Sequence, residues 1–273
     1  MTSKTAVVHG AGGTQGAAIA NRLRAAGWEV RALGSSTVNL TDLDSVLAAY
    51  AGAEAVVVQL PLEFTPTAVT YAETILAALA KSTVPQAILN PGSPLPPEPI
   101  GQPYVDARVL LAGGLAEAVE HAAVIAPAGP YLENLVQPWS VDRVRTAGEL
   151  AYPFPADLPV PWSTLDDIGD LIATTLEGAQ SNPLSLLTGP EPLTGHDIAA
   201  AVATATGRDV RWTPVTPSAY GELLVPVIGA PAAAAIAAMY EQQATTPPPA
   251  LPAELLHRGS TTVADWARRQ RWT

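Results

Sequence analysis

The chain has 273 residues, with 25 acidic and 14 basic side chains and a formal net charge of −11. This acidity argues against a nucleic-acid partner, because a phosphate backbone requires a basic protein face. The lack of cysteine excludes disulfides, thiolate metal ligands and a cysteine nucleophile, and the four histidines have no metal-ligand spacing, so we expect no metal site.

No targeting or membrane segment is expected. Met1 to Val8 leads directly into a strand-like run instead of a signal peptide. The longest apolar tract, Val225 to Met239, is interrupted by Pro226, Gly229 and Pro231. These features predict a cytoplasmic globular protein without a membrane partner.

A glycine-rich turn near the start of the chain is its most informative motif. Gly10, Gly13 and Gly16 follow an apolar run at residues 5–8 and precede a helix-like run at residues 14–26. Glycines in such a turn let the chain reverse tightly, bring backbone N–H groups close to a phosphate and pack the helix against the strand. The predicted cofactor-binding residues of this turn are Gly10, Gly12, Gly13, Thr14, Gln15 and Gly16.

The segment after the second predicted strand is unusually short. That strand covers residues 29–33, and only Gly34 to Thr37 separate it from Val38–Leu40. Parallel strands need a crossover of about a dozen residues or more, so Val38–Leu40 is not expected to pair as the usual third strand of a dinucleotide fold. At the position of Ser35 and Ser36, an acidic residue would bind the ribose of NAD and an arginine would bind the 2′-phosphate of NADP. Serine is neutral, so no charge at this position favours either cofactor.

Strand-like and helix-like runs continue to alternate through the first half of the chain. In order, we predict a helix opened by Thr41, a strand at 55–60, a helix at 67–81, a strand at 86–90, a proline-rich loop at 91–103, a helix from about Tyr104 and a strand at 122–125. This alternation predicts an α/β fold with a Rossmann-like doubly wound parallel sheet. We expect a nucleotide-binding domain at 1–150, completed by segments within 159–190, and a smaller C-terminal substrate-side region at 190–273.

At several points the chain resembles the NmrA-like family of atypical short-chain dehydrogenases/reductases. The matching segments are GAGGTQG at 10–16, VRAL at 30–33, AGAEAVVV at 51–58, GPYLENL at 129–135, STLDDIG at 163–169, LTGPEPLT at 187–194 and TVADW at 262–266. The resemblance implies a Rossmann-like domain that usually binds NADPH and a substrate cleft against the C-terminal region. Family members commonly carry arginine after the VRAL strand, where this chain has Ser35 and Ser36.

Short-chain reductases use a Tyr-x-x-x-Lys pair on a helix, and the equivalent residues here are Tyr104 and Arg108. Arginine keeps the charge and the i, i+4 spacing but cannot release a proton. We predict this pair as catalytic, with the alternatives that Tyr104 is an aromatic packed beside the cleft and that Arg108 anchors cofactor or substrate. The candidate substrate-contacting residues are Ser93, Tyr131, Asn134 and Trp162. The alternative for Ser93 is a plain turn residue, and the alternative for the other three is packing in the core.

Three functions are compatible with the sequence. The first is an NAD(P)H-dependent reductase of a small hydrophobic or aromatic carbonyl or conjugated substrate, with NADP(H) favoured by the resemblance and NAD(H) as the alternative. The second is a redox-neutral cyclase, isomerase or dehydratase whose cofactor is weakly held or lost. The third is an NAD(P)-sensing regulatory protein. The sequence leaves the substrate identity and the oligomeric state open.

Overall fold

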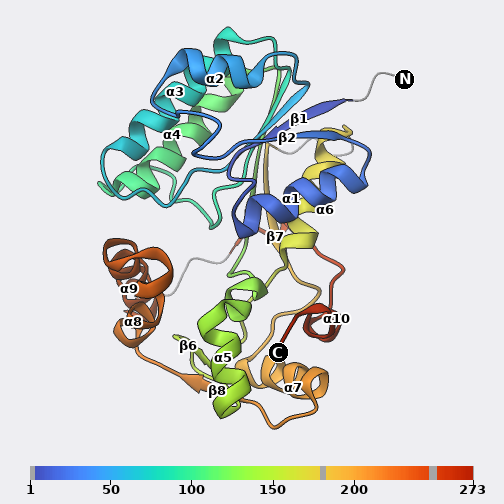
Figure 1. The fold of residues 1–273 in the computed structure, drawn as a ribbon, viewed down its shortest axis with the longest axis vertical. Helices are drawn as coiled ribbons and strands as arrows, with labels where there is room; N and C mark the ends of the chain where they lie inside the picture. Colours follow the sequence, from blue (N-terminus) through green and yellow to red (C-terminus); the bar gives the residue numbers. More distant parts are fainter. Residues whose placement is uncertain (1–3, 179–182, 246–250, 273) are drawn as a thin grey trace. The chain divides into compact units, whose positions relative to one another are not determined.

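The computed structural model describes residues 4–178, 183–245 and 251–272 (Figure 1). The chain forms two compact units. The first unit consists of Met1–Pro127, Leu165–Leu187 and Leu255–His257, and the second of Ala128–Thr164, Thr188–Glu254 and Arg258–Thr273. The functional domain bounds expected from the sequence stay a prediction, because contacts within a unit do not show which ligand that unit binds.

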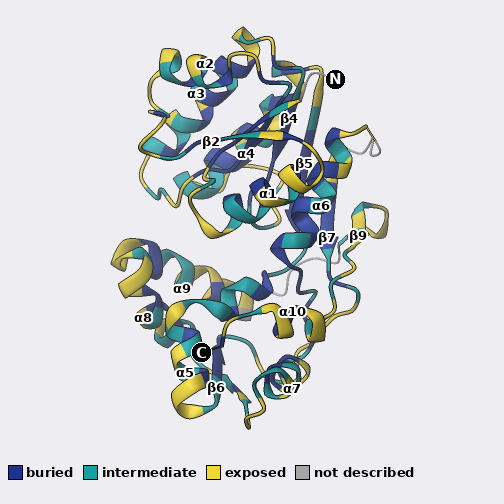
Figure 2. Cartoon of the chain, turned by 45° about the vertical axis from the view of Figure 1, so that its right-hand side comes forward, coloured by how far each residue is buried: buried dark blue, intermediate teal, exposed yellow. Residues whose placement is uncertain are grey.

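The first unit is built on a seven-stranded sheet with the order β2-β1-β3-β4-β5-β7-β9. Its strands are β1 (Thr5–Val8), β2 (Glu29–Ala32), β3 (Ala55–Val58), β4 (Gln86–Leu89), β5 (His121–Pro127), β7 (Leu184–Thr188) and β9 (Leu256–Arg258). Every pair from β2 to β7 is parallel. All four residues of the central strand β3 are buried, so helices cover it on both faces. Figure 2 draws the neighbouring strands β4 and β5 largely in the colour of buried residues.

Helices cover both faces of this sheet. They are α1 (Thr14–Ala25), α2 (Leu43–Tyr50), α3 (Thr67–Lys81), α4 (Pro103–Ala118) and α6 (Leu165–Leu176). Figure 1 shows α2, α3 and α4 on one face and α1 and α6 on the other. Within these layers α3 packs against α2 and α4, and α1 packs against α6. The predicted Rossmann-like, doubly wound α/β fold is confirmed.

The start of α2 differs from the prediction by one residue. Asp42, not Thr41, is the N-cap, and its carboxylate accepts a hydrogen bond from the N–H of Asp44 at 3.1 Å. Thr41 stays in the preceding turn because the side-chain oxygen of Asn39 accepts from its N–H and its hydroxyl, at 3.1 and 2.8 Å.

The edge of the sheet beside β2 shows the effect of the short connection. Val38–Leu40 forms no strand, as predicted, and β2 is the edge strand. Val38 is buried in the core beneath α2, α3 and α4. Arg31 on β2 donates to the carbonyls of Ala49 and Ala51 at the C-terminal end of α2, at 2.7 and 2.9 Å. These bonds fasten the edge strand to the helix that follows the turn.

The second unit contains a two-stranded parallel sheet and a mainly helical surround. The strands are β6 (Glu149–Tyr152) and β8 (Arg211–Pro214), and the helices are η1 (Leu132–Val136), α5 (Pro138–Ala147), α7 (Gly195–Thr206), α8 (Pro217–Ile228), α9 (Ala230–Thr245) and α10 (Val263–Arg269), with a short turn η2 at Ala253–Leu255. Its core is unusually aromatic. The ring of Tyr152 lies 5.0 to 5.8 Å from those of Phe154, Trp162, Trp212, Tyr220 and Tyr240.

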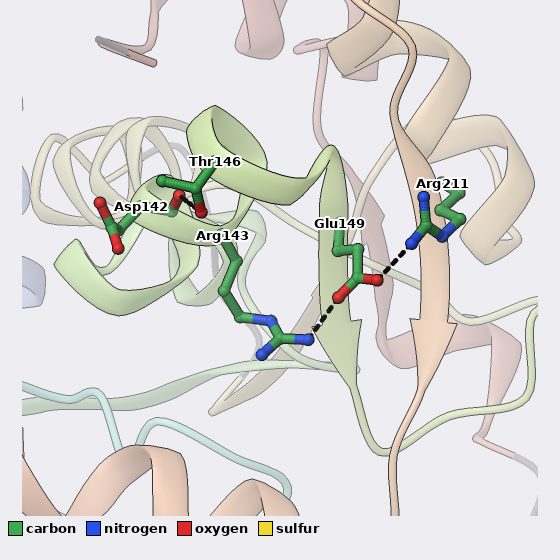
Figure 3. Close-up of polar contacts among 5 residues, drawn as sticks. All are labelled: Asp142, Arg143, Thr146, Glu149 and Arg211. Atoms are coloured by element: carbon green, nitrogen blue, oxygen red, sulfur yellow. Dashed lines mark hydrogen bonds and ion pairs between the residues drawn. The ribbon is translucent and has the colours of Figure 1, made fainter.

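An ion triad joins α5 to this small sheet (Figure 3). The carboxylate of Glu149 on β6 accepts from Arg143 on α5 and from Arg211 on β8, and Glu149 and Arg211 are register partners. The Glu149 side chain is 17% exposed, whereas the nearby Asp142–Arg145 pair is more than half exposed on both sides. Solvent screens the triad less than it screens that surface pair.

Replacing Glu149 with glutamine should therefore lower the free energy of unfolding by about 1 kcal/mol, because two arginines lose their shared charge partner. The matched control is Asp142→Asn, which should change it by less than about 0.5 kcal/mol. Urea unfolding of both variants measures the difference. If both variants lose the same free energy of unfolding, the triad contributes no more to stability than the exposed Asp142–Arg145 pair.

Candidate functional site

The carboxyl ends of β1, β3 and β4 lie at one edge of the sheet, because these neighbouring strands are parallel. The loops that leave this edge begin at His9, Gln59 and Asn90. In doubly wound sheets, ligands bind outside the carboxyl ends of the strands. These three loops therefore form the candidate site.

The loop after β1 has the geometry of a tight strand-to-helix turn. Gly10 has a φ of +63°, and its carbonyl accepts from the N–H of Gly13 at 2.9 Å. A Cβ atom on Gly16 would lie 2.2 Å from the Gly10 carbonyl oxygen, whereas one on Gly12 would meet nothing within 4 Å. Gly16 thus allows α1 to begin directly against the turn.

The N-terminus of α1 is free to receive an anion. Its N-cap is Gly13, which has no side chain to cap the helix, and the first turn carries no acidic residue. Gly12, Gly13 and Thr14 are exposed. The first N–H groups of a helix have no partner within the helix and lie at its positive end. These residues fit a phosphate or pyrophosphate group.

A network of buried amide side chains lies beside this turn. The amide of Gln59 donates to the His9 carbonyl at 3.1 Å, and the amide of Asn90 approaches the side-chain oxygens of Gln59 and Gln15 at 3.4 and 3.5 Å. Asn90 also accepts from the N–H of Gly92 at 3.1 Å. The network connects the first turn of α1 with the ends of β3 and β4. Sequence reasoning missed Gln59 and Asn90, although each directly follows a buried apolar strand.

His9 is held in place by the core. Its Nε2 lies 2.8 Å from the hydroxyl of Tyr50, and the side chains of both residues are buried. Burial lowers the pKa of His9 to about 4 and raises that of the Tyr50 phenol. His9 is therefore neutral near pH 7, and its place is structural.

Arg108 fastens the loops of the site to α4. It is 3% exposed. Its guanidinium donates to the carbonyls of Leu60 at 3.1 Å, Pro91 at 3.2 Å and Tyr104 at 2.6 Å. Among the described residues, no acidic side chain forms an ion pair with it. Burial lowers the pKa of this guanidinium, which nevertheless stays charged.

Two strands are shorter than predicted. The strands expected to end at residues 60 and 90 end at Val58 and Leu89. The carbonyls of Leu60 and Pro91, which lie beyond these ends, accept hydrogen bonds from Arg108.

The structure brings Tyr104 and Arg108 together, but not through the phenol oxygen. The guanidinium carbon lies 3.6 Å from the centre of the Tyr104 ring, and the ring of Phe64 stacks on it at 4.7 Å. In a Tyr-x-x-x-Lys pair the cation must act on the phenol itself to ease proton loss. Arg108 donates its hydrogen bonds to backbone carbonyls and not to the Tyr104 hydroxyl, although its charge also interacts with the Tyr104 side chain. The catalytic role of the pair stays a prediction.

The serine candidates lie in loops of the first unit. Ser35 and Ser36 are exposed in a turn closed by Thr37, whose hydroxyl bonds both to the N–H of Gly34 at 2.9 Å and to its carbonyl at 3.0 Å. This turn adjoins the glycine loop, because the N–H of Ala11 donates to the carbonyl of Leu33, the residue before Gly34, at 3.1 Å. Ser93 is partly buried in the loop after β4.

The other substrate candidates belong to the second unit. Tyr131 and Trp162 are only 3% and 1% exposed, and the Trp162 ring lies 5.0 Å from that of Tyr152. The amide of Asn134 approaches the Tyr152 hydroxyl at 3.4 Å, and that hydroxyl lies 2.5 Å from the hydroxyl of Tyr240. Direct contact between Trp162 and a substrate would require this core to open.

Within the described ranges, no three His, Cys, Asp or Glu side chains are grouped so that they could hold a metal ion. None of the helices described is both long enough and apolar enough to span a membrane.

Comparison with solved structures shows the same fold in proteins of different function. A nucleoside-diphosphate-sugar epimerase from Staphylococcus aureus matches with a TM-score of 0.71 and 17% identity, over 97% of this chain and 100% of the other. The Citrobacter sp. triphenylmethane reductase complexed with NADP(H) has a TM-score of 0.69 and 16% identity, over 97% and 99%. The negative transcriptional regulator NmrA has a TM-score of 0.64 and 18% identity, over 98% and 95%. At these identities the likeness concerns the fold alone.

Sequence comparison identifies the family. No curated protein sequence matches the chain significantly. The model of the NmrA-like family matches residues 115–262, which is more than half of the chain. The chain therefore belongs to the NmrA-like family and has a Rossmann-like α/β fold.

Proposed function

We propose that this protein is a nicotinamide-nucleotide-dependent reductase of a small hydrophobic carbonyl or conjugated compound. The observation that carries the proposal is the uncapped N-terminus of α1 behind the turn of Gly10 to Gly16, with no acidic residue in its first turn. Such a helix end suits the pyrophosphate of a dinucleotide. The similarity to a reductase complexed with NADP(H) supports the same choice.

In this proposal the N–H groups of Gly12 and Thr14 would hold the pyrophosphate, while that of Gly13 stays bonded to the Gly10 carbonyl. A bound nicotinamide nucleotide would supply hydride chemistry at the substrate carbon. The carbonyl oxygen then needs a proton, which Tyr104 or a water molecule donates. Arg108 keeps the loops after β3 and β4 in place through its bonds to Leu60 and Pro91. Its role is positioning, since its donors point at backbone carbonyls.

A redox-neutral enzyme on the same scaffold is the second candidate. Two observations favour it. Arg108 donates to the backbone carbonyl of Tyr104 and makes no hydrogen bond to its phenol oxygen, as a catalytic lysine would, and among the described residues no strand lies beyond β2. A cyclase, isomerase or dehydratase needs no hydride, so its activity would survive removal of the nucleotide.

The decisive experiment strips the purified protein of nucleotide and follows product formation from quinones, enones and aldehydes with and without NADPH. Strict dependence on NADPH, with equal consumption of NADPH and substrate, supports the reductase. Full activity without nucleotide contradicts it and favours the redox-neutral enzyme. Tight NADPH binding without turnover of any substrate would favour a sensor.

A Gly13→Asp variant tests the glycine loop. Aspartate is a good N-cap, so its carboxylate should accept hydrogen bonds from the free N–H groups of α1 and stabilise the helix by about 0.3 kcal/mol. The same carboxylate would occupy the position of a phosphate group and repel its negative charge. We expect NADPH affinity, measured by calorimetry, to fall by about a hundredfold or more, with an unchanged or higher melting temperature.

The matched control for this variant is Gly113→Asp. Gly113 is exposed on α4, and a Cβ atom there meets nothing within 4 Å. The control adds the same charge away from the loop and should bind NADPH like the wild type. Equal NADPH binding by both variants and the wild type would show that the loop does not hold the nucleotide.

A further inference from the structure

We infer that this site recognises the nicotinamide half of its cofactor and makes little use of the adenosine half, so that a reduced nicotinamide mononucleotide binds nearly as well as NADPH. The inference rests on the proposed function and concerns which part of the nucleotide the protein reads.

The sheet itself carries the first part of the argument. A dinucleotide fold consists of two mononucleotide-binding halves with the strand order 3-2-1-4-5-6, so that one half contributes a strand beyond its second. Here the order is β2-β1-β3-β4-β5, and β2 is the edge. The half that starts at β1 has therefore lost its outer strand and crossover helix, whereas the half formed by β3, β4 and β5 is complete.

The turn that replaces the lost crossover offers no charged group to an adenosine ribose. Ser35 and Ser36 are neutral and exposed, and the Thr37 hydroxyl is occupied by Gly34. A 2′-phosphate would need an arginine, and a free ribose diol would need a carboxylate. The turn of residues 34–37 contains neither.

The charged and amide side chains nearest in sequence to this turn each make hydrogen bonds that hold the rebuilt edge together. Arg31, the basic residue of β2, donates through Nη1 to the carbonyls of Ala49 and Ala51, which holds its side chain at the C-terminal end of α2. The side-chain oxygen of Asn39 accepts from Thr41, and the Asp42 carboxylate caps α2. Redirecting any of them to a ligand would break a bond that shapes the rebuilt edge, which reduces the gain in affinity.

The opposite half of the site is polar and firmly held. Gln59 and Asn90 follow β3 and β4, are 8% and 2% exposed, and bond to each other and to the glycine loop. Arg108 fastens the same two loops to α4. These bonds fix the positions of the two loops, so a ligand seated at the α1 N-terminus lies beside a preorganised backbone, whereas the adenosine meets an open edge.

Calorimetric titration of the wild-type protein tests the inference with NADPH, NADH, reduced nicotinamide mononucleotide and adenosine 2′,5′-bisphosphate. The three nicotinamide ligands should have dissociation constants within about tenfold of one another, and the bisphosphate should neither bind nor displace them. An affinity for NADPH about a hundredfold above that for the mononucleotide, or displacement by the bisphosphate, would overturn the inference and leave the proposed function standing. If no nicotinamide ligand binds, the proposed function itself fails.

A Ser35→Arg variant gives a second readout. It supplies the cation that family members carry after this strand. If the adenosine is not held, the ratio of the NADPH and NADH affinities should change by less than about threefold. A gain of about tenfold or more in NADPH preference would place the 2′-phosphate beside residue 35 and contradict the inference.

Discussion

Replacing Tyr104 with phenylalanine is expected to lower turnover by about two to four decades in a cofactor-dependent reaction. The change removes only the hydroxyl, which is the proposed proton donor. Phenylalanine keeps a ring for Phe64 to stack on and a face for the Arg108 guanidinium to cover. The free energy of unfolding and the NADPH affinity should therefore stay close to those of the wild type. The loss of turnover would then come from the proton-transfer step.

The companion variant Arg108→Lys separates catalysis from positioning. A lysine has three donors on one nitrogen and cannot reach the carbonyls of Leu60, Pro91 and Tyr104 together. Buried carbonyls without partners should lower the free energy of unfolding by about 2 kcal/mol. Steady-state kinetics and urea unfolding of both variants provide the comparison. Undiminished turnover of Tyr104→Phe under strict NADPH dependence would keep the reductase and remove Tyr104 from its mechanism.

The sheet and its helices could be predicted from the sequence, because alternating buried runs and amphipathic runs leave few topologies with short connections. The absence of an outer strand could also be predicted, since the four residues from Gly34 to Thr37 are too few for a crossover. The exact start of α2 could not, because Thr41 and Asp42 are both good caps and a local bond to Asn39 decides between them.

The directions of polar side chains at the sheet edge were beyond sequence reasoning. The i, i+4 spacing correctly places Tyr104 and Arg108 side by side, but the guanidinium points at carbonyls that only the folded chain brings near. Gln59 and Asn90 follow buried strands, where polar residues ordinarily mark nothing more than a strand end. Trp162 is similar: an aromatic residue near a cleft and one in a core have the same sequence signature.

Replacing Gly16 with alanine should have the largest effect on stability of the changes considered. The new Cβ atom would lie 2.2 Å from the oxygen and 2.4 Å from the carbon of the Gly10 carbonyl, and 2.8 Å from the nitrogen of Ala11. All three are backbone atoms, so no side-chain rotation relieves the overlap. Either α1 or the turn must move away from β1, and overpacking of this kind costs about 3 kcal/mol of unfolding free energy.

The same movement displaces the N–H groups of α1 from the turn, so NADPH affinity should fall by about a hundredfold or more in Gly16→Ala. Gly12→Ala is the stability control, because a Cβ atom at Gly12 meets nothing within 4 Å. Its free energy of unfolding should stay within about 0.5 kcal/mol of the wild type. Urea unfolding measures both variants, and calorimetry measures the affinity of Gly16→Ala under conditions where it is folded. If Gly16→Ala has the stability and NADPH affinity of the wild type, the turn is loose enough to admit a side chain. The anion site would then not depend on the close approach of α1 to β1.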